Sequence, residues 1–109
     1  MSLQSNQNKI NLLSMRKLNT LISNKNLKIK TKKYTSIIGL SPSKGARSPK
    51  LWNRAFKKYR IKNEMVPFDV KKNNLSKLLN FLEHDQNYMG GCITVPYKEK
   101  VFKWLRKNI

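Results

Sequence analysis

The stretch Gly90-Gly91-Cys92-Ile93-Thr94-Val95-Pro96-Tyr97-Lys98 decides the fold that we expect for this chain. Residues 92–95 predict a short buried strand, and Pro96 ends it and starts a helix with Lys98 in its first turn. A strand that leads directly into a helix aims that first turn at the carboxyl end of a sheet, where ligands bind in open α/β folds. The Thr94 hydroxyl and the Lys98 ammonium therefore predict a site for an oxygen-rich, anionic small molecule.

A second stretch upstream repeats this arrangement. Residues 37–53, Ile-Ile-Gly-Leu-Ser-Pro-Ser-Lys-Gly-Ala-Arg-Ser-Pro-Lys-Leu-Trp-Asn, predict a strand, a loop and a helix. The loop is rich in Gly, Pro and Ser, as tight functional loops often are. Ser48 suits the N-cap of the helix and Pro49 its first turn. Two such units, each with a hydroxyl at the helix entrance, indicate one shared pocket.

The segments between these two stretches continue the alternation of strands and helices. Glu64 to Val70 predicts a second strand, and Pro67 places that strand at the border of the sheet because proline lacks an N–H donor. Asn74 is expected to cap a helix with four leucines at the spacing of one face: Leu75, Leu78, Leu79 and Leu82. The alternation predicts parallel strands with right-handed crossovers, in an α/β, three-layer α-β-α sandwich of the flavodoxin-like type.

Two side-chain patterns on the expected helices are interpreted as structural. The helix after Ser48 carries an apolar and aromatic stripe that we expect to pack in the core: Leu51, Trp52, Ala55, Phe56 and Tyr59. His84, at the end of the leucine helix, is expected to be a capping or surface group rather than a metal ligand.

Length and charge limit the classes of function. A chain of 109 residues supports one domain with a modest core. The formal net charge of +19 would suit nucleic acid or an anionic membrane surface. However, Lys and Asn are abundant and Arg is scarce, which is typical of an AT-rich genome, and we favour that explanation. Dedicated nucleic-acid binders more often use arginine forks and exposed aromatic side chains.

The single cysteine and the N-terminal segment bear on location. Cys92 alone excludes an internal disulfide and a cysteine-rich zinc site. No apolar run approaches the roughly 20 residues of a membrane span, so a cytoplasmic location is expected.

Residues 1–33 are basic and free of acidic residues, and we expect a disordered extension or a lead-in helix rather than an organellar transit peptide. The domain itself is expected at residues 34–109.

The two motifs resemble those of one known family. Shikimate dehydrogenases carry Ser-x-Ser-Pro-x-x-His-Asn after the first strand of their N-terminal, substrate-binding domain and Gly-x-Asn-Val-Thr-x-Pro-x-Lys after the third. Residues 46–53 and 90–98 match these motifs in order and spacing, within a similarity that runs from about Tyr34 to Leu105. The resemblance implies an oxidoreductase of aromatic amino acid biosynthesis that reduces 3-dehydroshikimate to shikimate with NADPH.

The resemblance also implies roles for individual residues. Lys98 matches the family lysine that acts with a later aspartate on the proton that joins the new alkoxide, so it is the catalytic candidate. Thr94 matches a residue that hydrogen-bonds the substrate. Ser48 matches the second of two serines that hold the substrate carboxylate, and a helix start favours an anion there. A purely capping role explains Ser48 equally well.

This chain departs from the family motifs at several positions. Ala46 stands at the first loop serine, and Trp52 replaces the motif histidine. Cys92 stands at the binding asparagine, and a thiol is only a weak donor and acceptor. Arg47 or Lys44 could replace the lost carboxylate contacts, and the departures put the identity of the ring acid in doubt more than the fold.

The chain lacks the sequence features of a cofactor domain. Its four glycines, Gly39, Gly45, Gly90 and Gly91, form no Gly-x-Gly-x-x-Gly turn. The family's Rossmann domain, which binds NADP, and its catalytic aspartate would lie past Ile109, so we expect part of an enzyme, inactive alone. Two alternatives stay open: a non-catalytic domain that binds a polyhydroxy acid or docks on a cofactor subunit, and a small basic nucleic-acid-binding protein.

Overall fold

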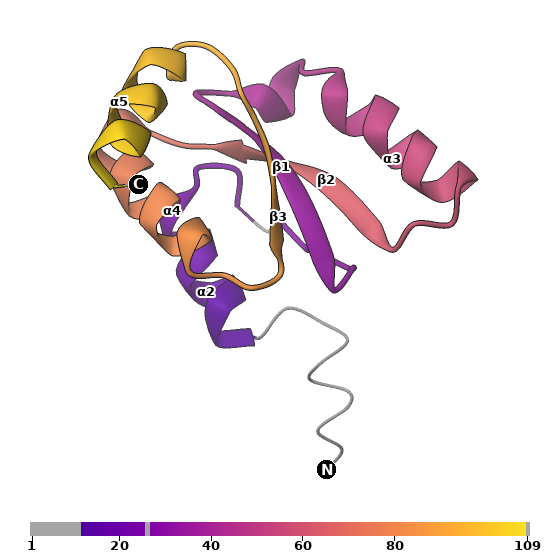
Figure 1. Ribbon diagram of the computed structural model, residues 1–109. Coiled ribbons are helices and arrows are strands. Elements are labelled where there is room, and N and C mark those ends of the chain that lie inside the picture. The colour runs from indigo at the N-terminus through magenta and orange to yellow at the C-terminus, as the bar shows by residue number, and fades with distance from the viewer. Residues whose placement is uncertain (1–11, 26, 109) are drawn as a thin grey trace.

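The computed structural model describes residues 12–25 and 27–108 of the chain (Figure 1). The elements, in chain order, are α2 (Leu12–Leu21), β1 (Lys33–Gly39), the 3-10 turn η1 (Pro42–Lys44), α3 (Ser48–Lys58), β2 (Asn63–Asp69), the 3-10 turn η2 (Lys72–Asn74), α4 (Leu75–Glu83), β3 (Tyr88–Ile93) and α5 (Lys98–Asn108). Figure 1 shows α3 on one side of the sheet and α2, α4 and α5 on the other. The expected three-layer α/β architecture is therefore confirmed.

The described sheet has three parallel strands in the order β2-β1-β3. β1 lies in the centre, with Lys33 beside Asn63 on β2 and Ile38 beside Ile93 on β3. The parallel pairing follows from the helical crossovers between the strands. The prediction that Pro67 marks a border strand is confirmed, since β2 lies at one edge.

The core lies between the sheet and the helices α2, α4 and α5. Alternate residues of β1 and β2 face it, as the pleat requires, and Tyr34, Ile38 and Phe68 are almost fully buried. The leucine face of α4 packs there as predicted, and α2 and α5 complete the cluster: Leu18, Leu21, Ile22, Leu75, Leu78, Leu79, Leu82 and Val101. Burying each large aliphatic side chain contributes roughly 1.5–3 kcal/mol, so this face supplies most of the hydrophobic stabilisation.

The opposite face, under α3, differs from the sequence prediction. None of the residues of α3 is buried, and Leu51, Trp52 and Tyr59 are 62%, 53% and 67% exposed. The prediction that this stripe packs in the core was wrong. α3 packs mainly against β2, at the edge of the described sheet, so its stripe is only partly covered.

β3 also differs from its prediction. The strand begins at Tyr88, so the pair Gly90-Gly91 lies inside it instead of forming a turn before it. Gly90 has a φ of 110°, and the register with β1 shifts between Tyr34 and Ser36. An irregularity of this kind favours glycine. The expectation of a buried strand was wrong as well, because Cys92 is exposed at the border of the sheet.

Neither of the two predicted helix caps makes a side-chain hydrogen bond in the structure. Arg47, not Ser48, occupies the N-cap position of α3, and no side chain caps it. Asn74 occupies the N-cap position of α4, as predicted, but its side chain makes no cap hydrogen bond. In both cases the preceding backbone is already helical, which is not the conformation from which an N-cap side chain reaches back to the free N–H groups.

Part of the basic N-terminal segment packs on the domain. α2 contributes Leu18 and Leu21 to the core, and the loop after it runs along the outer edge of β2. The division at residues 33 and 34 stays a prediction, and residues 1–11 of the expected extension lie outside the described residues. Within the described part of the chain, no helix has the length and apolar character needed to cross a membrane.

Candidate functional site at the carboxyl ends of β1 and β3

The two sequence motifs meet where β1 and β3 end. The Thr94 amide donates to the Ile38 carbonyl oxygen over 2.8 Å, and the Leu40 amide donates to the Val95 carbonyl oxygen over 3.3 Å. These bonds continue the pairing of the strands into their loops. They enclose a pocket of about 260 Å³ that both loops line: Ser41, Pro42, Gly45, Ala46, Thr94 and Val95. The expected shared pocket is thus present as a geometric feature.

Gly39 permits the close approach of the two loops. A Cβ atom at this position would lie 2.4 Å from the Thr94 Cγ2 and 3.0 Å from the Val95 carbonyl oxygen. The first distance is far below van der Waals contact and the second is tight, so glycine lets Thr94 sit against the end of β1. The position of Thr94 at the pocket therefore depends on glycine at residue 39.

A buried carboxylate at the end of β2 holds the first loop. Asp69 is 5% exposed, and its Oδ1 accepts the backbone N–H of Ser43 over 2.8 Å. The Ser43 hydroxyl donates to the other carboxylate oxygen. On the opposite side, Asn24 accepts the Asp69 N–H over 2.9 Å through its Oδ1. Asp69 thereby fixes η1, which precedes Gly45 and Ala46 at the pocket.

Tyr97 anchors the start of α5. Its ring is buried, its hydroxyl donates to the Val70 carbonyl oxygen over 2.8 Å, and its N–H donates to the Thr94 carbonyl oxygen over 3.1 Å. Burial raises the pKa of the Tyr97 phenol, so the hydroxyl keeps its proton and its role as a donor. The Val95–Pro96 peptide bond is cis. Lys98 follows as the first residue of α5, with its side chain exposed.

The sequence-predicted site residues do not all line one pocket. Thr94 lines the pocket between the loops, whereas Cys92 lines a second pocket of about 250 Å³ on the α3 side of the sheet. Arg47 and Ser48 lie at the start of α3, one and two residues past Ala46 at the pocket rim. The ligand roles of these residues and of Lys98 stay predictions.

Ser48 has a free hydroxyl in the described structure. No cap bond involves it, and among the described residues its Oγ makes no hydrogen bond to another group. The N–H groups in the first turn of α3 follow Arg47 in the chain. The Arg47 side chain caps none of them. Free N–H groups at a helix start favour an anion in general.

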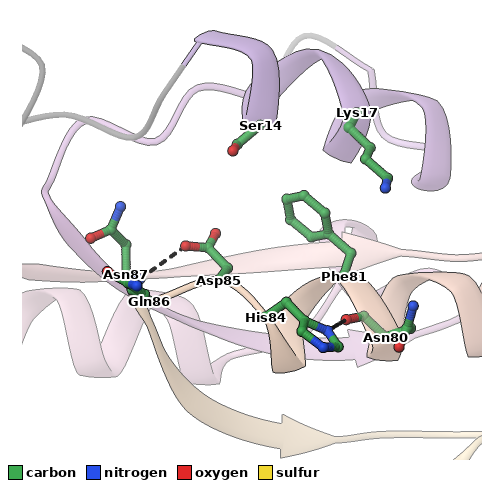
Figure 2. A pocket seen from close by; sticks show the side chains of 8 residues that line it. All are labelled: Ser14, Lys17, Asn80, Phe81, His84, Asp85, Gln86 and Asn87. Atoms are coloured by element: carbon green, nitrogen blue, oxygen red, sulfur yellow. Dashed lines mark hydrogen bonds between the residues drawn. The ribbon is translucent and has the colours of Figure 1, made fainter.

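A different pocket of about 510 Å³ lies at the amino ends of the strands (Figure 2). Ser14 and Lys17 point into it from α2, toward the ring of Phe81 and the carboxylate of Asp85. Asp85 accepts the Tyr34 hydroxyl over 2.7 Å, which ties this end of the sheet together. The pocket lies at the end of β1 opposite to Thr94 and contains no residue of either motif, so we do not connect it with the motif site.

Comparison with known proteins identifies the family of this chain. A family model described as the shikimate dehydrogenase substrate binding domain matches residues 37–108. The chain belongs to this family. The NADP(+)-dependent shikimate dehydrogenase of Carboxydothermus hydrogenoformans is 38% identical over 73 residues, which cover 67% of this chain and 25% of the relative. That of Pyrococcus furiosus is 42% identical over 73 residues, which cover 67% of this chain and 26% of the relative.

Solved structures show the same fold. A crystal structure of a shikimate dehydrogenase in complex with NADP+ superposes with a TM-score of 0.61 and 27% identity, and covers 67% of this chain and 25% of the other. Shikimate dehydrogenase 1 from Peptoclostridium difficile superposes with a TM-score of 0.59 and 28% identity, covering 66% and 27%. The substrate-binding domain described here thus spans about a quarter of the length of these relatives.

Sequence reasoning missed Asp69 as a residue of the site. A usable signal was present: with just five acidic residues in the chain, an acidic residue at the end of an apolar strand is unusual. A carboxylate at the end of a parallel strand lies at the edge where the other strand ends meet. Within residues 12–25 and 27–108, no group of His, Cys, Asp and Glu side chains is placed to hold a metal ion.

Proposed function

We propose that this domain is the substrate-binding portion of a shikimate dehydrogenase-like enzyme of the cytoplasm, which reduces 3-dehydroshikimate to shikimate with NADPH. The observation that carries the proposal is the shared pocket, in which Thr94 from the second motif faces residues 41–46 from the first. The family membership and the chain order of the two motifs support the same substrate class.

The carboxylate of the substrate would bind at the start of α3. Ser48 offers a free hydroxyl and the uncapped first turn offers N–H groups. Arg47 adds a guanidinium, which pairs well with a carboxylate because it donates two parallel hydrogen bonds. Lys44 on η1 is a second cation on the same loop. These groups would compensate for Ala46, which has no hydroxyl.

The reacting end of the substrate would lie toward Thr94 and Lys98. The Thr94 hydroxyl donates a hydrogen bond to a ring oxygen and orients the ring. As the ketone becomes an alkoxide, the Lys98 ammonium stabilises the negative charge and supplies the proton to that oxygen. Lys98 is free to reach a ligand because it is exposed and, among the described residues, is not part of an ion pair.

The residues of this chain do not fit a nicotinamide cofactor. The turn that cradles a pyrophosphate needs closely spaced glycines at the start of a helix, and neither Gly45 nor the pair Gly90-Gly91 lies in such a turn. NADP would therefore bind to a part of the enzyme outside this chain, which would also supply the aspartate partner of Lys98. In the proposal, this chain alone binds substrate without turning it over.

Shikimate titration monitored by amide NMR tests the proposal. We expect saturable shifts at Thr94 and in residues 41–48, and weaker binding in Lys98→Ala and Thr94→Val. Lys100→Ala is the matched control, because Lys100 is an equally exposed lysine on the same helix. An equal loss of shikimate affinity in Lys98→Ala and Lys100→Ala would show that Lys98 contributes only its positive charge and makes no specific contact. Shifts confined to other surfaces would overturn the proposed site.

A further inference from the structure

Positive charge is concentrated in two short segments of the chain. Residues 28–33, which precede and begin β1, and residues 57–62, which span the end of α3 and the turn into β2, each contain four cationic residues and no acidic residue. The eight cations are Lys28, Lys30, Lys32, Lys33, Lys57, Lys58, Arg60 and Lys62. A compositional bias toward lysine explains the 24 cationic residues of the chain, but it does not explain why a third of them lie in these two segments.

The fold brings the two segments side by side at the amino ends of β1 and β2 (Figure 1). Lys33 and Asn63 are register partners, and the Lys30 N–H donates to the Glu64 carboxylate over 2.5 Å. Seven of the eight cationic side chains are exposed, and that of Lys33 is half-buried. We call the two segments together the basic surface.

The protein itself neutralises little of this charge. Glu64, the acidic residue that contacts the basic surface, offsets at most one of the eight positive charges. Among the described residues, none of the eight cations forms an ion pair. The partial negative charge at the end of α3 favours Lys57 and Lys58, but it does not reach the cations of the other segment. Like charges that lie close together repel one another, and a bound polyanion would relieve that repulsion.

Arg60 occupies a position where arginine is unfavourable for the backbone. Its φ is 56°, in the left-handed region, and the Ile61 N–H donates to the Phe56 carbonyl oxygen over 2.8 Å. A helix end of this shape usually carries glycine or asparagine at this position. Asparagine is abundant in this chain, whereas arginine is scarce. Neither the backbone nor the composition therefore accounts for a guanidinium at residue 60.

An exposed aromatic ring lies within the basic surface. Tyr59 is 67% exposed and stands between Lys58 and Arg60 in the sequence. The Lys58 ammonium lies 5.5 Å from the centroid of the Tyr59 ring. A ring that is this open to solvent and surrounded by cations is suited to stack on a nucleic-acid base.

These features fit single-stranded nucleic acid better than other polyanions. Its phosphates pair with ammonium groups, and a guanidinium donates two parallel hydrogen bonds to one phosphate. Its bases are free to stack on an aromatic side chain, whereas the bases of a duplex are already stacked on one another. An acidic protein segment would pair with the same cations but offers no base to Tyr59.

We propose that the basic surface binds single-stranded nucleic acid, with Arg60 and the lysines on the phosphates and Tyr59 stacked on a base. The basic surface lies at the amino ends of the strands, whereas Thr94 and Lys98 follow the carboxyl end of β3. The inference therefore goes beyond the proposed function and does not depend on it.

The probe is a fluorescein-labelled uridine oligomer of about 12 nucleotides, titrated against the full chain and followed by fluorescence anisotropy. One variant neutralises four cations of the basic surface: Lys30→Gln, Lys32→Gln, Arg60→Gln and Lys62→Gln. The matched control has the same net charge and neutralises four exposed lysines elsewhere: Lys71→Gln, Lys72→Gln, Lys77→Gln and Lys100→Gln. We expect the first variant to bind about tenfold more weakly or worse. Its slope of log K against log salt should become shallower by about 0.7 for each phosphate contact that is lost, while the control keeps the original slope.

Tyr59 is tested by a separate pair of variants. Tyr59→Ala should weaken binding by about tenfold, because a ring that stacks on a base contributes about that much to affinity. Tyr59→Phe keeps the ring and should bind normally. Thr94→Val should bind the oligomer normally as well, so failure of the substrate site and failure of this site are separable.

Three results would overturn the proposal. Equal losses of affinity in the two four-residue variants would show that net charge alone holds the oligomer. Unchanged binding by Tyr59→Ala would show that no base stacks on the ring. Tighter binding to vesicles of phosphatidylserine and phosphatidylcholine than to the oligomer, lost in the basic-surface variant, would assign the surface to an anionic membrane.

Discussion

Gly91 lies directly against the backbone of Ser36. A Cβ atom on Gly91 would sit 1.9 Å from the Ser36 carbonyl oxygen and 2.8 Å from the Ser36 carbonyl carbon. The two residues are register partners in the β1–β3 ladder, just past the irregularity in that ladder. Ser36 is itself fully buried, and its hydroxyl bonds the Tyr88 hydroxyl over 2.8 Å. Glycine at position 91 is therefore required for the pairing of β3 with β1.

Gly91→Ala should destabilise the fold strongly. The added methyl group meets backbone atoms that cannot move without separating β1 from β3. Overpacking typically costs about 1–3 kcal/mol, and we expect a loss near the upper end of that range. Urea unfolding followed by circular dichroism measures the effect. Gly45→Ala is the control: nothing lies within 4 Å of its Cβ position and its φ is −175°, so we expect a change of at most about 0.5 kcal/mol. A similar midpoint for both variants would contradict the contact.

Gly39→Ala should weaken ligand binding through Thr94. The new Cβ would collide with the Thr94 Cγ2 and displace the Thr94 side chain from its place at the pocket. The double variant Gly39→Ala, Thr94→Ser removes the colliding methyl group and keeps the hydroxyl, so it should recover part of the shikimate affinity. Thr94→Ser alone should bind nearly as well as the original chain. Binding by the double variant no better than by Gly39→Ala would contradict a steric origin.

The elements that could be predicted from the sequence are those determined by residues close together in the chain. The four leucines of α4 repeat at helical spacing and all lie in the core. Pro67 predicted the border strand from the missing N–H alone, because that property does not depend on the rest of the fold. The two strand–loop–helix units predicted the meeting of the motif loops, since the carboxyl ends of parallel strands lie at one edge.

The features that failed to follow from the sequence depend on distant parts of the chain. The pair Gly90-Gly91 is a turn signal locally, yet it lies inside a strand, where the backbone of β1 leaves no room for a side chain at Gly91. The apolar stripe of α3 has the spacing of a buried face, but Trp52 is exposed. Whether a side chain is buried depends on what packs over the helix, and the sequence of the helix does not contain that information. Asp69 acquires its role from Ser43, which is 26 residues away in the sequence. Local periodicity carries none of this information.

Alkaline pH should destabilise the fold through its buried tyrosines. Burial, and then the hydrogen bond to Asp85, raise the pKa of Tyr34, and burial raises the pKa of Tyr88. Below the unfolded-state pKa of about 10, both states hold the proton and the stabilisation is complete. As pH rises past about 10, the unfolded chain ionises first, so the free energy of unfolding falls. Urea midpoints between about pH 8 and 11 measure the slope.

Tyr34→Phe separates this effect from the titration of the many lysines. The variant lacks the phenol but keeps all other charges, so its stability should fall less steeply above about pH 10. At neutral pH it should lose about 1 kcal/mol, because the hydrogen bond to Asp85 is gone. Tyr59→Phe, at an exposed tyrosine, is the control and should match the original chain at neutral pH. Parallel pH curves for Tyr34→Phe and the original chain would contradict the assignment to Tyr34.

Asp69→Ala should release the loop that lines the substrate pocket. The carboxylate accepts both the N–H and the hydroxyl of Ser43, and hydrogen bonds to a charged group contribute about 1.5–3 kcal/mol each. We expect a loss of about 3–6 kcal/mol in unfolding free energy and faster exchange of the Ser43 amide. Ser43→Ala is the matched comparison, since it removes the hydroxyl bond alone and leaves the N–H bond to Oδ1. The amide at residue 43 should therefore stay protected in Ser43→Ala and lose protection in Asp69→Ala. If the amide of residue 43 stayed as protected in Asp69→Ala as in Ser43→Ala, η1 would hold its shape without Asp69. The carboxylate would then have no part in forming the pocket.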